Sequence, residues 1–282
     1  MAGTSMKDIK LRIKSVESTM QITKAMQLVA TSKLRRAKER MEMSRPYADI
    51  ARQAIISASI SCDDPTVPYL IKQTDKKSCY IIIAGERGLA GGYNNNLFKA
   101  QLAHAEGKEY CALPIGRKAI EKYTRLGVQL LSDAYHGVED LNVSRCRKIA
   151  GMLLDEFRKG TYGDLYLVYT SFKTMMSQEP EIIQLLPVLP EDGMKKEKNV
   201  STVYDPDIKE MLEAVMQDYL AGTLYSALCN SFLSEVASRR SAMDSATKNA
   251  GDMISELKLR FNRARQGAIT QEITEIVAGA EQ

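Results

Sequence analysis

The most regular hydrophobic pattern in the chain runs from Asp207 to Gln282, a stretch that contains no proline. Its apolar residues recur at alternating steps of four and three: Leu224, Leu228, Phe232 and Val236, then Ala250, Ile254, Leu257, Phe261, Ala264 and Ala268. This alternation is typical of the seam of a coiled coil. At 1.5 Å per residue one helix of this length would measure roughly 110 Å, so no small domain could bury it and we expect other chains to surround it.

A second long helix is predicted from Met6 to about Ile60. Its seam begins at Ile9, Ile13, Val16 and Met20, and we expect it to shift, as after a stutter, to Ile22, Met26 and Val29. Thr4 or Ser5 is placed to cap the start of this helix. Pro46 is expected to kink the helix without ending it, because the apolar pattern resumes at Ile50.

Between these two helices the hydrophobic period changes. Strands are expected at Ser78–Ala84, Glu109–Ile115, Gln129–Leu131, Asp164–Thr170 and Glu181–Leu186. Helices are expected at Asn95–Ala105, Arg117–Leu126 and Ser144–Lys159. Strands that alternate with helices favour an α/β domain with a largely parallel sheet.

The predicted fold is therefore mixed α/β: a long antiparallel coiled coil of residues 1–60 and 207–282, with an α/β domain of residues 61–206 inserted between them. The C-terminal helix is the longer by about 20 residues, so its tip should project roughly 30 Å beyond its partner. An apolar stripe lies on that tip: Ile269, Ile273, Ile276 and Ala280, with Val277 beside it. The N-terminal helix could cover this stripe, but the difference in helix length favours a socket supplied by another protein.

The net charge of +4 is distributed unevenly. Residues 1–60 have an excess of Lys and Arg, whereas residues 207–282 have an excess of Asp and Glu. Such segments suit an antiparallel helix pair, or a basic face that meets an acidic protein. The basic run from Lys33 to Arg40 contains no aromatic residue and winds around its helix, so we do not expect nucleic-acid binding.

Candidate chemistry is sparse. The five cysteines form no Cys-x-x-Cys motif and the chain has two histidines, so we expect free thiols and no zinc site. We find no arrangement of Ser, His, Asp or Cys that indicates a catalytic residue, and no pattern that indicates a metal or a cofactor. The glycine-rich GERGLAGGYN (Gly85–Asn94) follows a predicted strand and precedes a predicted helix, where a nucleotide-binding loop would lie. Its glycine spacing matches neither G-x-G-x-x-G nor the P-loop, so a tight turn that binds no nucleotide is favoured.

The sequence also bears on the membrane. It has no run of about eighteen apolar residues that could span a bilayer. Its first residues, MAGTSMKDIK, lack the apolar core of a secretory signal, so we expect a cytoplasmic chain.

Three segments resemble the γ subunits of bacterial F-type ATP synthases. KDIKLRIKSVESTMQITKAMQLVATSKLRRA (Lys7–Ala37) is similar to the opening of that family, and ARQGAITQEITEIVAGAEQ (Ala264–Gln282) is similar to its signature end. GERGLAGGYN resembles the motif of its middle domain, in which Asp usually stands where Glu86 stands here. The resemblance covers essentially the whole chain in the right order, without the cysteine-bearing insertion of the thiol-regulated chloroplast form.

The resemblance implies an antiparallel coiled coil with an inserted Rossmann-like domain. It implies a central rotor shaft, not itself an enzyme, that couples proton- or sodium-driven rotation of a c-subunit ring to conformational change in the catalytic β subunits. The implied partners are the α and β subunits of the hexamer, the ε subunit and the c ring. The implied location is the cytoplasmic face of the bacterial cell membrane, as a peripheral subunit that meets the membrane through the complex.

The resemblance also implies the contact residues. Those expected to meet a β subunit are Met26, Arg239, Gln266, Thr270 and Glu272. Those expected to form an apolar bearing at the top of the hexamer are Ile269, Ile273, Ile276 and Val277. Those expected to meet the c ring and the ε subunit are Tyr204 and Asp205.

Two other interpretations remain open from the residues alone. The long helices could make a homodimeric coiled-coil scaffold, which light scattering of the purified chain would detect. The α/β domain could make a nucleotide-dependent enzyme, which equilibrium dialysis with NAD and ATP would detect.

Overall fold

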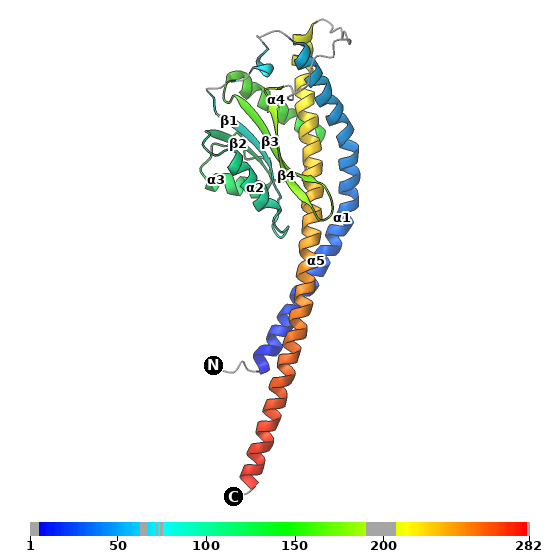
Figure 1. Ribbon diagram of the computed structural model, residues 1–282, viewed down its shortest axis with the longest axis vertical. Helices are drawn as coiled ribbons and strands as arrows, with labels where there is room; N and C mark the ends of the chain where they lie inside the picture. Colours follow the sequence, from blue (N-terminus) through cyan, green and yellow to red (C-terminus); the bar gives the residue numbers. More distant parts are fainter. Residues whose placement is uncertain (1–5, 63–66, 72, 74–75, 190–206, 281–282) are drawn as a thin grey trace. The chain divides into compact units, whose positions relative to one another are not determined.

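The computed structural model describes residues 6–62, 67–71, 73, 76–189 and 207–280. In chain order its elements are α1 (Met6–Ser61), the 3-10 helix η1 (Pro68–Leu70), β1 (Ser78–Ile83), α2 (Tyr93–His104), β2 (Tyr110–Ile115), α3 (Arg117–Arg125), α4 (Val143–Lys159), β3 (Asp164–Phe172), β4 (Gln178–Leu186) and α5 (Ile208–Ala280) (Figure 1). Contacts divide the chain into a terminal unit, Met1–Thr31 with Arg239–Gln282, and a central unit, Ser32–Ser238. The helices α1 and α5 each contribute to both units.

The central unit contains a four-stranded sheet in the order β2-β1-β3-β4. Strand β1 is parallel to both of its neighbours, and β4 is antiparallel to β3. The predicted strand at Gln129–Leu131 is reduced to one bridge between Leu130 and Ala112. Ala112 and Pro114 direct their backbone groups to the same edge of β2, and Pro114 has no N–H to donate, so the pairing cannot continue.

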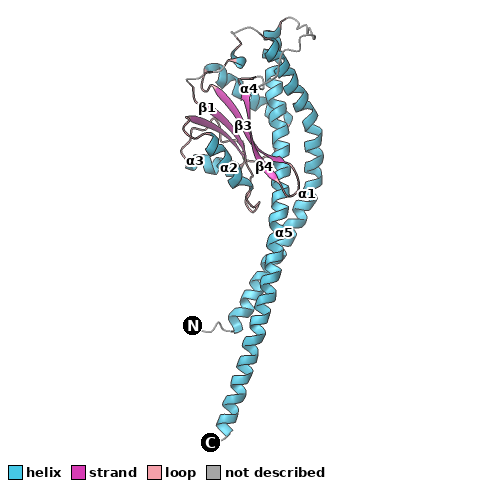
Figure 2. Cartoon of the chain, viewed as in Figure 1, coloured by secondary structure: helices cyan, strands magenta, loops and turns pink. Residues whose placement is uncertain are grey.

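Helices cover both faces of this sheet (Figure 2). All six residues of β1 are buried, as expected for a central parallel strand. Tyr80 and Ile82 pack with α2 and α3, whereas Ile81 and Ile83 pack with α4 and the first part of α5. The alternation of β1 side chains therefore separates two apolar cores.

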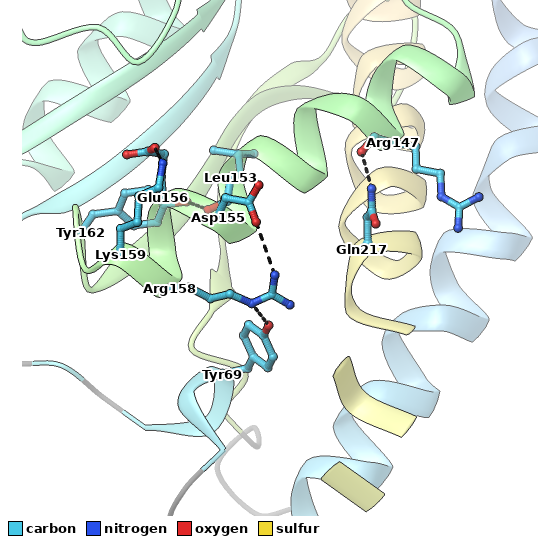
Figure 3. Close-up of polar contacts among 9 residues, drawn as sticks. All are labelled: Tyr69, Arg147, Leu153, Asp155, Glu156, Arg158, Lys159, Tyr162 and Gln217. Carbon is cyan, nitrogen blue, oxygen red and sulfur yellow. Dashed lines mark hydrogen bonds and ion pairs between the residues drawn. The ribbon is translucent and has the colours of Figure 1, made fainter. Parts of the chain in front are cut away.

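Helix α4 is fastened at both of its ends (Figure 3). Near its start the side-chain amide of Gln217, on α5, donates to the carbonyl oxygen of Arg147 at 3.0 Å. Near its end Nε of Arg158 donates to the hydroxyl of Tyr69, in η1, at 2.8 Å. Helix α4 therefore connects α5 to the segment that follows α1.

In the terminal unit α1 and α5 run antiparallel. Side chains join across the pair from Lys258 to Glu17 (4.0 Å), between Thr247 and Thr23 (2.8 Å), and from Gln27 to Asp244 (2.9 Å). The predicted α5 seam is confirmed here, since Ala250, Ile254 and Leu257 are buried.

The predicted shift in the α1 seam is wrong. Ile22 and Val29 are 58% and 59% exposed, and the seam continues in unbroken heptad steps through Thr23, Gln27 and Ala30. Polar residues can occupy these positions because their groups are satisfied: the Thr23 hydroxyl lies 3.0 Å from the carbonyl oxygen of Met20 as well as against Thr247. An apolar pattern alone missed this continuation.

Helix α1 begins at the predicted residue, Met6, and α5 begins one residue after the predicted start at Asp207. Helix α1 continues through Pro46. The carboxylate of Asp207 accepts a hydrogen bond from the backbone N–H of Glu210 at 2.9 Å and so caps the start of α5. The proposed caps Thr4 and Ser5, and the Lys-rich stretch 191–199, lie outside the described residues.

Candidate functional site: exposed faces of the terminal unit

The tip of α5 exposes a continuous set of apolar side chains. Every described side chain from Ile269 to Val277 is exposed, whereas Phe261, Ala264 and Ala268, the last seam residues, are half-buried. The exposed fractions of the four predicted bearing residues are 48% for Ile269, 57% for Ile273, 71% for Ile276 and 54% for Val277. The side chain of Ala280 lies outside the described set.

The exposed stripe does not continue the seam. Successive residues of a helix are turned by about 100°, which places Ile273 and Val277 on the side of α5 opposite Leu257 and Phe261. Ile269 and Ile276 flank that outer side. Helix α1 packs on the seam, so extending α1 would leave these residues uncovered. A separate surface is needed to bury them.

Two of the predicted polar contact residues share this outer face. Gln266 and Thr270 are one turn apart and both are exposed. The Thr270 hydroxyl donates to the carbonyl oxygen of Gln266 at 2.9 Å, which leaves its lone pairs directed outward as acceptors. Glu272 is exposed beside Ile276 and Ile269, nearer the seam side.

The other two predicted contact residues lie elsewhere. Met26 on α1 and Arg239 on α5 are both half-buried. Arg239 is separated from Gln266 by about 40 Å of helix, at 1.5 Å per residue. The five residues therefore do not converge on one site. Met26 and Arg239 lie well away from the tip, whereas Gln266, Thr270 and Glu272 are exposed near the end of α5.

An apolar stripe on α1 was not predicted. Leu11, Ile22 and Val29 are each more than half exposed, and helical geometry places them on one side of α1 beside Met26. The sequence prediction assigned Ile22 and Val29 to the seam, and so it missed this surface. The heptad positions taken by Thr23 and Gln27 were the signal that could have revealed it.

The polar part of the seam carries the main electrostatic effect of this unit. The Nζ of Lys248 lies 2.8 Å from one carboxylate oxygen of Asp244, and the side-chain amide of Gln27 donates to the other. These contacts, with the Lys248 bond the larger, hold the pKa of Asp244 below its usual value. Asp244 is therefore charged at neutral pH and links α5 to α1.

The predicted c-ring and ε contacts, Tyr204 and Asp205, lie outside the described residues. No helix within the described ranges is long and apolar enough to cross a membrane. The same residues contain no group of three or more His, Cys, Asp or Glu side chains placed to hold a metal ion.

The cysteines form no disulfide bonds. All five are free thiols and four of them are buried: Cys79, Cys111, Cys146 and Cys229. Burial raises the pKa of Cys146 to about 12, so this thiol stays protonated at neutral pH.

Comparison with known proteins supports one family. A family model described as ATP synthase matches residues 5–282. A curated protein called ATP synthase gamma chain, from Ruminococcus albus, is 44% identical over 278 residues and covers 96% of each chain. A protein of the same name from Alkaliphilus metalliredigens is 39% identical, with 99% of each chain covered.

Solved structures give the same fold. The rotor of the Euglena gracilis mitochondrial ATP synthase is similar with a TM-score of 0.66 at 18% identity, covering 94% of this chain and 98% of that one. A chain of the central stalk and c ring from the Tetrahymena thermophila mitochondrial ATP synthase has a TM-score of 0.57 at 25% identity, covering 80% and 99%.

Proposed function

Because this chain belongs to the ATP synthase γ-chain family and is thus a rotor subunit of the central stalk, we propose that it carries torque between a c-subunit ring and a hexamer of α and β subunits. In this proposal the chain is not itself catalytic. Ion flow, of protons or of sodium, turns the ring and the shaft together. The shaft then drives the β subunits through the conformations that synthesise or hydrolyse ATP.

The observation that carries the proposal is the exposed apolar stripe on the outer face of α5. Ile269, Ile273, Ile276 and Val277 would turn inside a sleeve formed by the top of the hexamer. A rotating contact must slide, and apolar contacts have no directional bonds that would have to break at each step. The stripe that a soluble monomer would not leave exposed is thus suited to a bearing.

The predicted β-subunit contacts would act differently. We infer that Gln266, Thr270 and Glu272 at one level, and Met26 and Arg239 at another, contact a β subunit as the shaft turns. Of these residues Arg239 and Glu272 can form charge-assisted hydrogen bonds, which contribute roughly 1.5–3 kcal/mol each. Bonds of that size, made to one β conformation and not to another, would shift the population of conformations as the shaft rotates.

The remaining partners belong to the other end of the shaft. We propose that the segment with Tyr204 and Asp205 meets the c ring and the ε subunit. The complex would lie on the cytoplasmic face of the bacterial cell membrane, where this chain is a peripheral subunit that reaches the membrane only through its partners. No contact with nucleic acid is part of this proposal.

Reconstitution with α and β subunits tests the function directly. With a bead on the central unit, the assembly should rotate during ATP hydrolysis and should contain one copy of this chain per hexamer. Rotation without this chain, or a different stoichiometry, would refute the proposal.

The bearing has its own test. Ile273→Lys should slow ATP hydrolysis by the assembled complex severalfold, because a charge in an apolar sleeve must be desolvated as it passes. Thr274→Lys, on a neighbouring face of the same exposed turn, is the matched control and should change the rate little. Equal rates for the two variants would count against an apolar sleeve.

A further inference from the structure

The sheet of the central unit has a topological switch point. The chain leaves β1 through α2 on one face of the sheet, and it enters β3 from α4 on the other face. In doubly wound folds, ligands bind in the crevice that this reversal opens at the carboxyl ends of the strands. In this protein the crevice lies beyond Ile83 and Phe172, next to the glycine-rich turn.

Helix α5 fills this crevice with polar side chains. The backbone N–H of Phe172 donates to the side-chain oxygen of Asn230 at 2.8 Å, and the Ser234 hydroxyl donates to the carbonyl oxygen of Thr170 at 3.0 Å. The Ser231 hydroxyl lies 3.4 Å from the carbonyl oxygen of Ile83. Ser231 and Ser234 are completely buried. The ends of β1 and β3 are thus satisfied by one helix.

The glycine-rich turn and the start of α2 are held by the same stretch of α5. The hydroxyls of Tyr93 and Ser231 are 2.8 Å apart, and the Tyr93 hydroxyl is also 3.1 Å from the carbonyl oxygen of Ser231. The Ser238 hydroxyl donates to the carbonyl oxygen of Ala90 at 2.8 Å.

A carboxylate takes the place beside the first glycine of the turn. Glu235 is only 6% exposed. A Cβ added at Gly85 would lie 2.9 Å from its carboxylate oxygen, so the carboxylate rests against the backbone of the turn. The Glu235 side chain therefore occupies space that a phosphate group would need beside this turn.

A small part of the crevice stays open. A cavity of about 60 Å³ is lined by Gly92, Asn96, Thr170 and Ser238, among others. The buried Thr170 hydroxyl has no hydrogen-bond partner among the described residues. The cavity has room for a few water molecules and is far smaller than an ordinary small-molecule pocket.

We propose that this crevice, which binds ligands in related architectures, serves here as a clamp. It prevents the α/β sheet from rotating about the axis of α5. The inference rests on the proposed rotor function. Hydrogen bonds weaken steeply when their angles change, so a set of them resists turning of the helix within the crevice. Apolar packing alone would resist such turning less. Ser231 and Tyr93 are its central positioning residues, because their hydroxyls join α5 to the turn.

The test measures torsional stiffness in the complex assembled with α and β subunits. A bead is attached through Lys99→Cys, an exposed site on α2, and its angular fluctuation is recorded while the rotor pauses without ATP. The double variant Tyr93→Phe with Ser231→Ala should at least double the angular variance of the bead. Ser255→Ala is the matched control, since this exposed hydroxyl bonds only within α5, and its variance should equal that of the unaltered chain.

The outcomes separate the two proposals. If the unaltered chain fails to rotate in the assembly, the rotor function is wrong. If the unaltered chain rotates and the double variant shows the same angular variance as the unaltered chain, the clamp is wrong. Tyr93→Phe alone keeps the buried ring, so it provides the measurement if the double variant does not fold: a variance raised above that of the unaltered chain supports the clamp, and an unchanged variance refutes it.

Discussion

The helix α5 lies in two contrasting environments. From Tyr219 to Ala237, in the central unit, no side chain is exposed. From Asp252 to Ala268, in the terminal unit, only the seam is buried or half-buried, and from Ile269 onward no described side chain is buried. A helix that buries every one of its faces must be enclosed, whereas one that buries a single stripe needs one partner. The same helix is therefore enclosed in the central unit. In the terminal unit it first pairs with α1, and its tip then stays exposed.

The largest expected effect is on packing in the enclosed part. Leu220→Ala should destabilise the chain by about 2–5 kcal/mol, because Leu220 is 2% exposed and truncation leaves a cavity among α5, α4 and the sheet. Leu259→Ala, on the same helix but 61% exposed, should change the free energy of unfolding by less than about 0.5 kcal/mol. Urea unfolding of both purified variants measures the difference, and similar losses would remove the contrast between the two parts.

The next effect concerns the buried hydroxyl of the enclosed part. Ser231→Ala should cost about 1–3 kcal/mol, since the Tyr93 hydroxyl and the Thr170 N–H would lose a buried partner. Equilibrium unfolding monitored by circular dichroism measures this loss. A loss no larger than that of Ser255→Ala, whose hydroxyl is exposed, would contradict the hydrogen bonding described for the crevice.

A smaller effect is expected in the seam of the terminal unit. Thr23→Val or Thr247→Val alone should cost about 0.5–1.5 kcal/mol, because each breaks the hydroxyl contact between α1 and α5. The double variant should be close to neutral, since two apolar groups of the same shape then face each other. Unfolding of the two singles and the double completes a double-mutant cycle, and additive losses would show that the two hydroxyls are not coupled.

The smallest effect is a dependence on pH. The pKa of Asp244 is lower in the folded chain than in the unfolded chain, so the unfolded chain binds the proton more tightly. The stabilisation from this group is present at neutral pH and is lost as the pH falls through its folded pKa. Asp244→Asn should therefore flatten the slope of stability against pH below about pH 4. An unchanged slope would mean that the contact with Lys248 and Gln27 does not persist in solution.

Several features could be predicted because they depend on local spacing. The heptad steps of α5 predicted both its length and its seam, and the change of period after Cys62 predicted the inserted α/β domain. The bearing residues were expected from the family resemblance, and the structure confirms only that their side chains are exposed.

Other features could not be predicted from one sequence. Ile22 and Thr23 are adjacent, and apolarity alone chose the wrong one for the seam. Which of them faces α5 depends on a hydroxyl partner 224 residues further along the chain. The strand at Gln129–Leu131 failed because Pro114 stands at the edge it would have joined, and only the strand order makes that edge relevant.

The sequence by itself determined the elements: two long helices, an α/β segment between them and an apolar C-terminal tip, because each follows from residues close together in the chain. Only the tertiary structure decided how those elements are used. It placed the polar face of α5 at the switch point of the sheet, and it turned the apolar tip away from α1. Both placements depend on contacts between residues far apart in the sequence, and such contacts cannot be predicted from the spacing of neighbouring residues.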